Sequence, residues 1–271
     1  MVSGVYKNMK FLSSKKKDKG IIFGIKVFYE STSLWRKTIQ ERLIQENKPI
    51  TTLYTLNFEL LSLAINYPKY ANILKSGSWV TVDGFAVSIL LFVRRFTIVR
   101  RICGSDLIFD LFDVCSKNGH KIALVGGKPD SLSNATKNVL EKYPQLSLVT
   151  MSPDFPTPLN IKESKELETF IIENRPEVVA VCLGSPKQEY WIAENKDFLQ
   201  KNGVKIVTGL GGTVDFLANA VPRAPVLLRM FGAEWIWRCY FEPFRLKRYG
   251  NACITIFKFL LRKINPIKKS A

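Results

Sequence analysis

Residues 178–189 read VVAVCLGSPKQE, a run of six apolar residues followed by Gly184 and a polar turn. A strand that is apolar at every position is buried on both faces, as in a parallel sheet between two layers of helices. The loop directly after such a strand is where open α/β sheets bind their ligands. The stretch therefore predicts an α/β fold with a ligand site at the carboxyl ends of its strands.

The rest of the chain between about residues 21 and 222 repeats this pattern. Short apolar runs alternate with longer amphipathic segments, which indicates βαβ units in a mostly parallel, Rossmann-like sheet with helices on both faces. The predicted strands are Ile21–Val27, Ile50–Thr55, Trp79–Val82, Lys121–Val125, Leu146–Thr150, Val178–Leu183 and Val204–Thr208. The predicted helices are Phe58–Ile65, Leu107–Ser116, Ser131–Lys142, Ile161–Asn174 and Gln188–Gln200.

Charge divides the chain into three parts. The 271 residues contain 40 Lys and Arg against 23 Asp and Glu, a formal net charge of +17. Residues 1–19 carry six lysines and one aspartate, and residues 223–271 carry eleven basic residues and two glutamates. We therefore predict a basic N-terminal tail (1–19), a nearly neutral core (20–222) and a basic C-terminal appendage (223–271). Two basic ends on a neutral body favour an anionic ligand or surface at those ends.

The appendage interleaves aromatic and basic residues and ends in a segment, Ala252–Ile264, with an amphipathic helical pattern. A terminal basic helix rich in Phe and Leu is typical of binding to a membrane surface. The alternative is that its apolar face packs on the core, and the concentrated positive charge favours the membrane. Trp235 and Trp237 fit either a membrane-interface belt or the seam between appendage and core.

Several function classes are disfavoured. Five cysteines without a C-x-x-C pair argue against a disulfide framework or a zinc ribbon and fit a reducing compartment. The single histidine, His120, precludes a two-histidine metal site, and no D-x-D pair is present to clamp a nucleotide-bound metal. No apolar run reaches the roughly 20 residues of a membrane span, and the N-terminus lacks the apolar region of a secretory signal. We therefore expect a cytoplasmic protein without a metal.

The loops after the predicted strands form a specific series, although none is a dinucleotide-binding or Walker A motif. In chain order they are Thr55-x-Asn57, Val82-Asp83-Gly84, Arg101-x-x-Gly104-Ser105-Asp106-Leu107, Leu124-x-Gly126-Gly127-Lys128-Pro129, Leu183-Gly184-x-Pro186-Lys187-Gln188-Glu189-x-Trp191, Gly209-x-Gly211-Gly212-x-x-Asp215, Arg223-Ala224-Pro225, Glu234-Trp235 and Glu242-Pro243-x-Arg245-x-x-Arg248-Tyr249. This series resembles the WecG/TagA/CpsF glycosyltransferase family (glycosyltransferase family 26) over roughly residues 21 to 250. Two positions depart from it: Val214, where the family usually has an aromatic residue, and Asn219, where a glycine is usual.

The resemblance implies a transferase that moves a sugar from a UDP-sugar to a polyprenyl-diphosphate-linked sugar, with inversion and without a metal. Family members transfer N-acetylmannosamine, its uronic acid or hexoses, for teichoic acid linkage units or other cell-surface polysaccharides. The partners it implies are the UDP-sugar, the lipid-linked acceptor and the anionic inner face of the plasma membrane. The UDP-sugar is a substrate, so no cofactor is expected. The donor sugar, the acceptor sugar and the oligomeric state, including a homo-oligomer, stay open.

Three residues near strand ends are the candidate catalytic group. An inverting transfer needs a carboxylate to take the proton from the acceptor hydroxyl, and the resemblance implies Asp83 for this role. Its alternative is to cap the helix that starts near Gly84. Thr55 and Asn57 can hydrogen-bond the sugar or position the base, and each can instead cap the helix near Phe58.

The candidate substrate-binding residues supply positive charge and backbone approach. Without a metal the diphosphate leaving group needs another cation, and the planar guanidinium fork suits phosphate; the resemblance implies the appendage arginines for this. The alternative for these arginines is a solvated or lipid-facing surface, and Arg101 either contacts the donor or pairs with an acid. Gln188 and Asp215 are predicted to contact the nucleotide, and Glu189 is predicted to be structural. The glycines are predicted to let the backbone approach a ligand closely. The full set is Arg101, Gly126, Gly127, Gln188, Gly211, Gly212, Asp215, Arg238, Arg245 and Arg248.

Two other functions compete with the enzyme. The sequence pI of about 9.7, with aromatic residues among basic ones, also occurs in nucleic-acid-binding proteins. We disfavour nucleic acid as a partner because the charge lies at the chain ends while the distinctive loops follow the strands. A non-catalytic peripheral membrane protein on the same fold would be expected to lack Asp83 or the arginines, and all of them are present.

Overall fold

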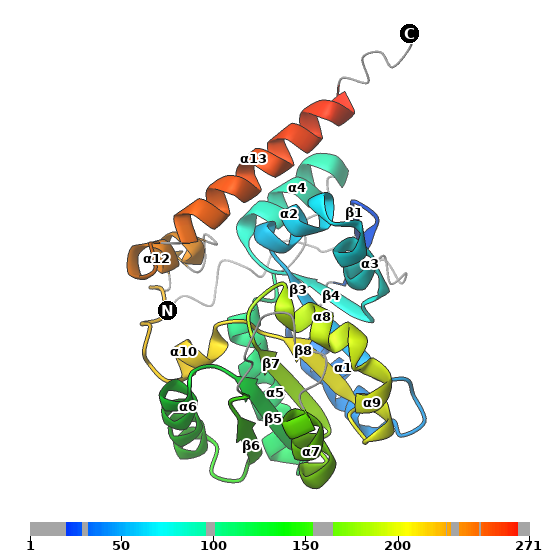
Figure 1. Ribbon diagram of the computed structural model, residues 1–271, viewed down its shortest axis with the longest axis vertical. Helices are drawn as coiled ribbons and strands as arrows, with labels where there is room; N and C mark the ends of the chain where they lie inside the picture. The colour runs from blue at the N-terminus through cyan, green and yellow to red at the C-terminus, as the bar shows by residue number, and fades with distance from the viewer. Residues whose placement is uncertain are drawn as a thin grey trace, which may run out of the picture.

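The protein is described by a computed structural model that covers residues 20–28, 32–95, 101–153, 165–225, 227–228, 233–243 and 245–264. The predicted N-terminal tail, residues 1–19, lies outside the described residues. Among the described residues, the main sheet is six-stranded and entirely parallel, in the order β4-β3-β8-β7-β5-β6 (Figure 1). Its strands are β3 (Thr51–Leu56), β4 (Trp79–Val82), β5 (Lys121–Gly126), β6 (Ser147–Met151), β7 (Val178–Cys182) and β8 (Ile206–Gly209).

Helices cover both faces of this sheet, as predicted. Alternate residues of β7 show it: Val179 and Val181 belong to one buried cluster, while Val178 and Ala180 belong to the other. The helices are α1 (Thr32–Ile44), α2 (Phe58–Asn66), α3 (Pro68–Ser76), α4 (Phe85–Arg95), α5 (Gly104–Asn118), α6 (Pro129–Lys142), α7 (Lys165–Asn174), α8 (Lys187–Glu194), α9 (Lys196–Lys201), α10 (Thr213–Leu217), α12 (Glu234–Phe241) and α13 (Arg245–Ile264). The predicted Rossmann-like α/β fold is confirmed.

The prediction that Ile21–Val27 is a strand of this sheet is wrong. It forms a separate antiparallel hairpin, β1 (Gly20–Ile22) and β2 (Ile25–Val27). The chain turns at Phe23 and Gly24, whose φ angles are 49° and 81°. A glycine adopts this left-handed conformation without steric cost, so Gly24 permits the tight reversal that splits the apolar run.

The predicted helices are confirmed with changed bounds. The segment 188–200 is interrupted at Asn195, whose side-chain amide donates to the carbonyl of Trp191, 3.0 Å away, so that α8 and α9 are separate helices. Residues 161–164 of the predicted helix 161–174 lie outside the described residues. Helices α1, α3, α10 and α12 were not predicted, and α4 was anticipated only as a helix near Gly84 that Asp83 could cap. In α1 the buried residues Trp35, Ile39 and Leu43 follow a spacing of four, a signal that was present in the sequence.

The appendage contributes α12 and α13, and α13 lies along α2 at one end of the molecule (Figure 1). The predicted terminal helix therefore begins at Arg245, earlier than expected. Ala252 and Ile256 are buried against the core, whereas Ile254 and Phe257 are 53% and 63% exposed. The helix thus packs one apolar side on the core and leaves another uncovered. Within the described ranges, no helix has the length and hydropathy needed to cross a membrane.

Candidate active site

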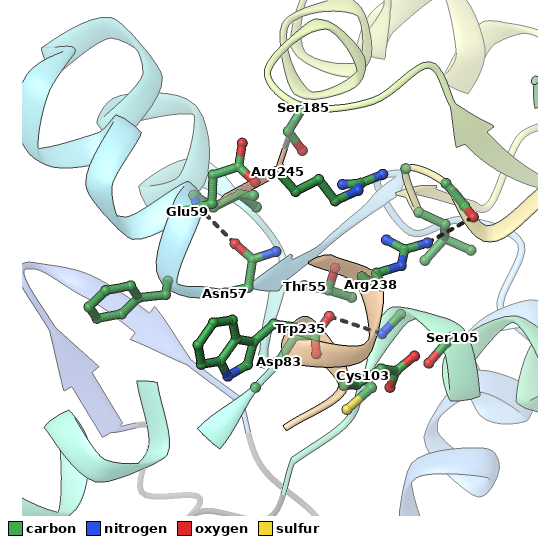
Figure 2. A pocket seen from close by; sticks show the side chains of 18 of the residues that line it. Thr55, Asn57, Glu59, Asp83, Cys103, Ser105, Ser185, Trp235, Arg238 and Arg245 are labelled. Carbon is green, nitrogen blue, oxygen red and sulfur yellow. Dashed lines mark hydrogen bonds between the residues drawn. The ribbon is translucent and has the colours of Figure 1, made fainter. Parts of the chain in front are cut away.

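A cavity of about 370 Å³ opens where the loops after β3, β4, β7 and β8 meet α12 and α13 (Figure 2). Core and appendage therefore line one cavity, at the edge of the sheet where ligands of open α/β folds bind. Ten of the thirteen predicted site residues line it: Thr55, Asn57, Asp83, Arg101, Gln188, Gly211, Gly212, Arg238, Arg245 and Arg248.

Asp83 directly follows β4 and is held by the start of α5. Its Oδ2 accepts a hydrogen bond from the Gly104 backbone N–H at 3.3 Å, and the Cys103 thiol also donates to it. Burial raises the pKa of Asp83, and the Gly104 and Cys103 donors and the charge of Arg238 oppose that rise. Among the described residues, the side-chain hydrogen bonds of Asp83 go to Cys103 and Gly104 at the start of α5 rather than to the start of α4, the helix that it would cap under the alternative interpretation.

Asn57 and Thr55 flank this carboxylate at the end of β3. The Oδ1 of Asn57 accepts from the Leu60 backbone N–H at 2.9 Å, so the capping alternative is observed for this residue, which lines the cavity as well. Thr55 is buried, and a Cβ built on Gly104 would lie 3.5 Å from its Oγ1. Thr55 and the loop that holds Asp83 are therefore closely packed.

The three appendage arginines converge on the cavity with different partners. Nη2 of Arg238 donates to the Gly212 carbonyl at 3.1 Å, and its guanidinium lies 4.2 Å from the Phe216 ring centroid. The Nε of Arg238 is buried without a hydrogen-bond partner among the described residues. Burial lowers the pKa of Arg238, and the nearby charge of Arg245 lowers it further.

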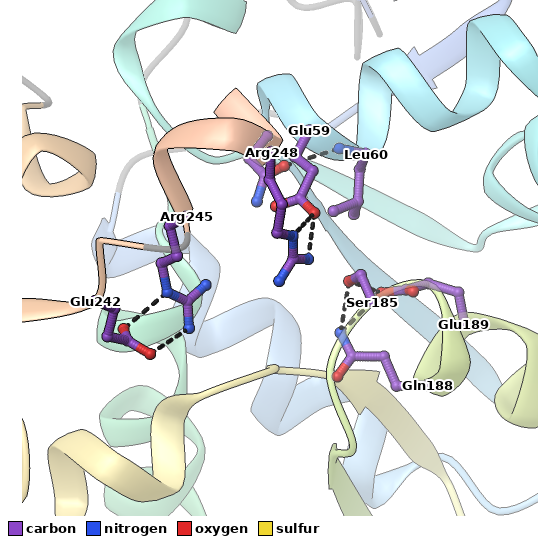
Figure 3. Close-up of polar contacts among 9 residues, drawn as sticks. Glu59, Leu60, Ser185, Gln188, Glu189, Glu242, Arg245 and Arg248 are labelled. Atoms are coloured by element: carbon purple, nitrogen blue, oxygen red, sulfur yellow. Dashed lines mark hydrogen bonds and ion pairs between the residues drawn. The ribbon is translucent and has the colours of Figure 1, made fainter. Parts of the chain in front are cut away.

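Carboxylates hold the other two arginines (Figure 3). Arg245 makes a two-pronged ion pair with Glu242, at 2.7 and 3.0 Å. Nε of Arg248 donates to Glu59 of α2 at 2.7 Å, a contact that joins the appendage to the core across 189 residues of sequence. The arginines are thereby placed at the cavity by protein contacts.

Gln188 connects the loops after β7 and β8. Its Oε1 accepts from the Gly211 backbone N–H at 2.8 Å, and its Nε2 donates to Glu189 at 2.7 Å. A Cβ on Gly209 would lie 2.8 Å from that Nε2, so only glycine leaves room for the amide. Glu189 is buried and also accepts from Ser185 at 2.9 Å, in agreement with its predicted structural role.

Gly126, Gly127 and Asp215 do not line the cavity. A Cβ on Gly126 would lie 2.6 Å from the Cys182 carbonyl oxygen, and one on Gly127 would lie 2.7 Å from Val214. These two glycines allow close packing between β5, β7 and α10. A Cβ built on Gly212 would lie 3.5 Å from Oδ2 of Asp215 and close to Nη2 of both Arg238 and Arg245, so the Asp215 carboxylate lies near these guanidinium groups without lining the cavity itself. Their predicted contacts with substrate stay predictions without support from the cavity.

A metal site is not evident in the parts of the chain that are described. There, no group of three or more His, Cys, Asp or Glu side chains could hold a metal ion. Among the described residues that line the cavity, the cationic side chains are those of arginines. Independence from metal stays a prediction that needs a biochemical test.

A comparison of the sequence with known protein families gives the same assignment as the series of loops. The model described as the glycosyl transferase WecG/TagA/CpsF family matches residues 22–269. The chain belongs to this family. The match confirms the resemblance drawn from the loops and confirms the enzyme class, a glycosyltransferase.

Similar proteins in the family are named N-acetylglucosaminyldiphosphoundecaprenol N-acetyl-beta-D-mannosaminyltransferase. The protein from Staphylococcus aureus (strain MRSA252) is 24% identical over 249 residues, 90% of this chain and 93% of that one. The protein from Bacillus subtilis (strain 168) is 27% identical over 194 residues, 72% of this chain and 73% of that one. A third, from Bacillus spizizenii (strain ATCC 23059 / NRRL B-14472 / W23), is 26% identical over 196 residues, with 72% and 73% covered.

The structure explains both departures from the WecG/TagA/CpsF pattern. Val214 is buried and packs directly against Gly127, where a Cβ would lie 2.7 Å from its side chain. Asn219 has a φ of 57°, in the left-handed region that glycine adopts freely and that asparagine tolerates better than most residues. Asn219 therefore preserves the turn toward Arg223, which pairs with Asp106.

Several polar or aromatic cavity residues of this family member had no predicted site role, among them Glu59, Cys103, Glu234, Trp235 and Tyr249. Glu234 and Trp235 stood in a quoted motif, and the signal that could have found them is their place just before Arg238 on one short helix. Trp235 packs against Tyr249 of α13 at 5.6 Å, within the appendage. Trp237 donates from Nε1 to the Pro222 carbonyl at 2.8 Å, at the start of the appendage.

Proposed function

We propose that this protein transfers a sugar of the N-acetylmannosamine type from its UDP-sugar to an N-acetylglucosamine carried on a polyprenyl diphosphate, in the synthesis of a teichoic acid linkage unit. The names of the three relatives support this donor and this acceptor. A hexose donor, in another cell-surface polysaccharide, is the alternative. The observation that carries the proposal is a carboxylate from the core and three arginines from the appendage facing one cavity.

Asp83 is the proposed general base. It accepts the proton of the acceptor hydroxyl while that oxygen forms a bond to the anomeric carbon of the donor sugar. The bond from that carbon to the β-phosphate oxygen breaks, and its electron pair leaves with UDP. A single displacement of this kind inverts the configuration at the anomeric carbon. The donors from Gly104 and Cys103 hold Asp83 in place and favour its ionised form, which the reaction requires.

The arginines are proposed to bind the diphosphate in place of a metal. Charge develops on the β-phosphate as the glycosidic bond breaks, and fixed cations at that point stabilise the transition state. Arg238 supports this role because its buried Nε–H lacks a hydrogen-bond acceptor among the described residues, and a phosphate oxygen could accept that hydrogen bond. Arg245 and Arg248 lie on the next helix with their guanidinium groups already fixed by Glu242 and Glu59.

The appendage is also proposed to dock on the anionic inner face of the plasma membrane, where a polyprenyl-linked acceptor is confined. Ile254, Phe257 and Leu261 form an uncovered apolar side of α13, and the appendage is strongly basic. Lys and Arg near such a surface contribute about 1 kcal/mol each. Vesicle co-sedimentation at low and high salt measures this attraction.

Purified protein incubated with a panel of UDP-sugars and short-chain diphospholipid acceptors, in EDTA, tests the function. We expect UDP-N-acetylmannosamine and the N-acetylglucosamine acceptor to give a product whose mass is that of the acceptor plus one N-acetylhexosamine. A product only with a hexose donor would favour the alternative. No product with any pair, under conditions where UDP binds, would contradict the proposal.

A further inference from the structure

The first turn of α12 places two unassigned side chains in the cavity that Asp83 lines. Glu234 and Trp235 both belong to its lining, and Trp235 lies beside Asp83 in Figure 2. They come from the appendage, whereas Asp83 comes from the core. The end of the cavity nearest the base is therefore bounded by side chains from both parts of the chain.

Glu234 is a partly buried carboxylate that lacks a recorded hydrogen bond or ion pair among the described residues. Burial and the charge of Asp83 raise its pKa, while the charges of Arg238 and Arg223 oppose the rise. A partly buried carboxylate without hydrogen bonds is stabilised when a bound ligand donates a neutral hydrogen bond to it. Sugar hydroxyls are such donors, whereas a phosphate would be repelled.

Trp235 offers a different contact. Its side chain is 46% exposed although it lines the cavity, and Tyr249 holds its ring from the side at a centroid distance of 5.6 Å. A large aromatic surface fixed in this way buries the apolar C–H face of a sugar ring at little entropic cost. Trp235 and Glu234 together present the two surfaces that a pyranose requires, one apolar and one hydrogen-bonding.

The charge distribution decides which sugar fits here. Arg238, Arg245 and Arg248 suit the diphosphate of the donor, whereas the carboxylates Asp83 and Glu234, which line the same cavity, repel it. We propose that Glu234 and Trp235 form the subsite for the sugar ring of the lipid-linked acceptor. In that subsite Trp235 stacks on the ring, and Glu234 accepts a hydrogen bond from a hydroxyl next to the one that Asp83 deprotonates.

This inference rests on the proposed function and adds a property to it. Glu234 and Arg238 lie one turn apart on α12, so one helix contributes to both the acceptor and the donor side.

The test is steady-state kinetics of the full chain with a short-chain N-acetylglucosaminyl diphospholipid, at one fixed pH for every variant. Glu234→Ala is expected to raise KM for the acceptor about 10- to 100-fold, and Glu234→Gln less, because a neutral acceptor makes a weaker hydrogen bond. Trp235→Ala raises the same KM, and Trp235→Phe restores most of the loss. KM for the UDP-sugar at saturating acceptor stays within about threefold. Ile236→Ala is the matched control, because Ile236 is an exposed neighbour outside the cavity lining.

Acceptors that lack one hydroxyl identify the contact. For the wild type, an acceptor that lacks the hydroxyl next to the attacking one should have a KM raised by the same factor as the Glu234→Ala substitution produces. In Glu234→Ala this deoxy acceptor should raise KM no further, because both changes remove the same hydrogen bond. The inference is overturned if the Glu234 and Trp235 variants keep the acceptor KM of the wild type. It is also overturned if, for every hydroxyl removed, the fold increases in KM caused by Glu234→Ala and by the deoxy acceptor multiply. A wild type that transfers no sugar at all contradicts the proposed function instead.

Discussion

Arg238→Ala separates the catalytic and structural roles of the appendage arginines. The guanidinium donates to the Gly212 carbonyl and lies over Phe216, while its Nε stays without a partner among the described residues. A hydrogen bond is worth about 1 kcal/mol and a cation–π contact about 0.5–2 kcal/mol. The substitution therefore lowers the free energy of unfolding by roughly 1.5–3 kcal/mol.

The expected loss of activity is larger than that of stability. If Arg238 stabilises the charge that develops on the β-phosphate, its removal lowers kcat about 10²- to 10³-fold, as for the loss of other fixed transition-state donors. Arg238→Lys keeps the charge without the fork and loses about 10-fold. The assays are turnover at saturating substrates and denaturant unfolding.

Arg36→Ala supplies the matched control. Arg36 of α1 pairs with Asp110 and Asp113 of α5, and none of these three residues lines the cavity. Its loss costs stability and leaves kcat unchanged. If Arg238→Ala loses stability while kcat stays within about threefold of wild type, Arg238 is only a packing residue and the arginine-for-metal argument is refuted.

Three further predictions test the base, the metal and the appendage. Asp83→Asn abolishes turnover and leaves the affinity for UDP, measured by titration, nearly unchanged. Because burial raises the pKa of Asp83, kcat of the wild type should begin to fall at a pH above the usual range of carboxyl groups as the solution is acidified. A kcat that stays constant down to pH 4 argues against Asp83 as the base. Activity survives EDTA and gains little from magnesium or manganese, whereas a loss in chelator that metal restores overturns the prediction. Truncation after Pro225 gives a folded but inactive core, and truncation after Gly250 weakens vesicle binding while sparing much of the turnover with a short-chain acceptor; full activity of the shorter chain would make the arginines membrane contacts only.

The parallel sheet was predictable because its strands are buried on both faces and read as continuous apolar runs. The hairpin at residues 20–27 has the same apolar composition, and only the left-handed turn at Gly24 separates it from the sheet. Loop residues after β3, β4, β7 and β8 reach one cavity because the carboxyl ends of parallel strands share an edge. The loop after β5 has similar glycines, but α10 packs on it, and that packing could not be read from Gly126 and Gly127.

Partners that are distant in the sequence were beyond prediction. Arg248 was expected to contact the donor, but nothing local indicates that Glu59 holds it from 189 residues away. The same holds for Glu234, whose significance depends on the position of Asp83 in the folded chain. The sequence motifs supply the reacting groups, and the tertiary structure determines which carboxylates stand beside them.

The anomeric configuration of the reaction product tests the central claim most directly. Wild-type protein, UDP-N-acetylmannosamine and the short-chain N-acetylglucosamine acceptor are incubated, and the one-bond carbon–hydrogen coupling at the new anomeric centre is measured by NMR. The account predicts a disaccharide whose anomeric configuration is opposite to that of the donor, and none with Asp83→Asn. A product that retains the donor's configuration, or one formed at the wild-type rate by Asp83→Asn, would contradict a single displacement assisted by Asp83.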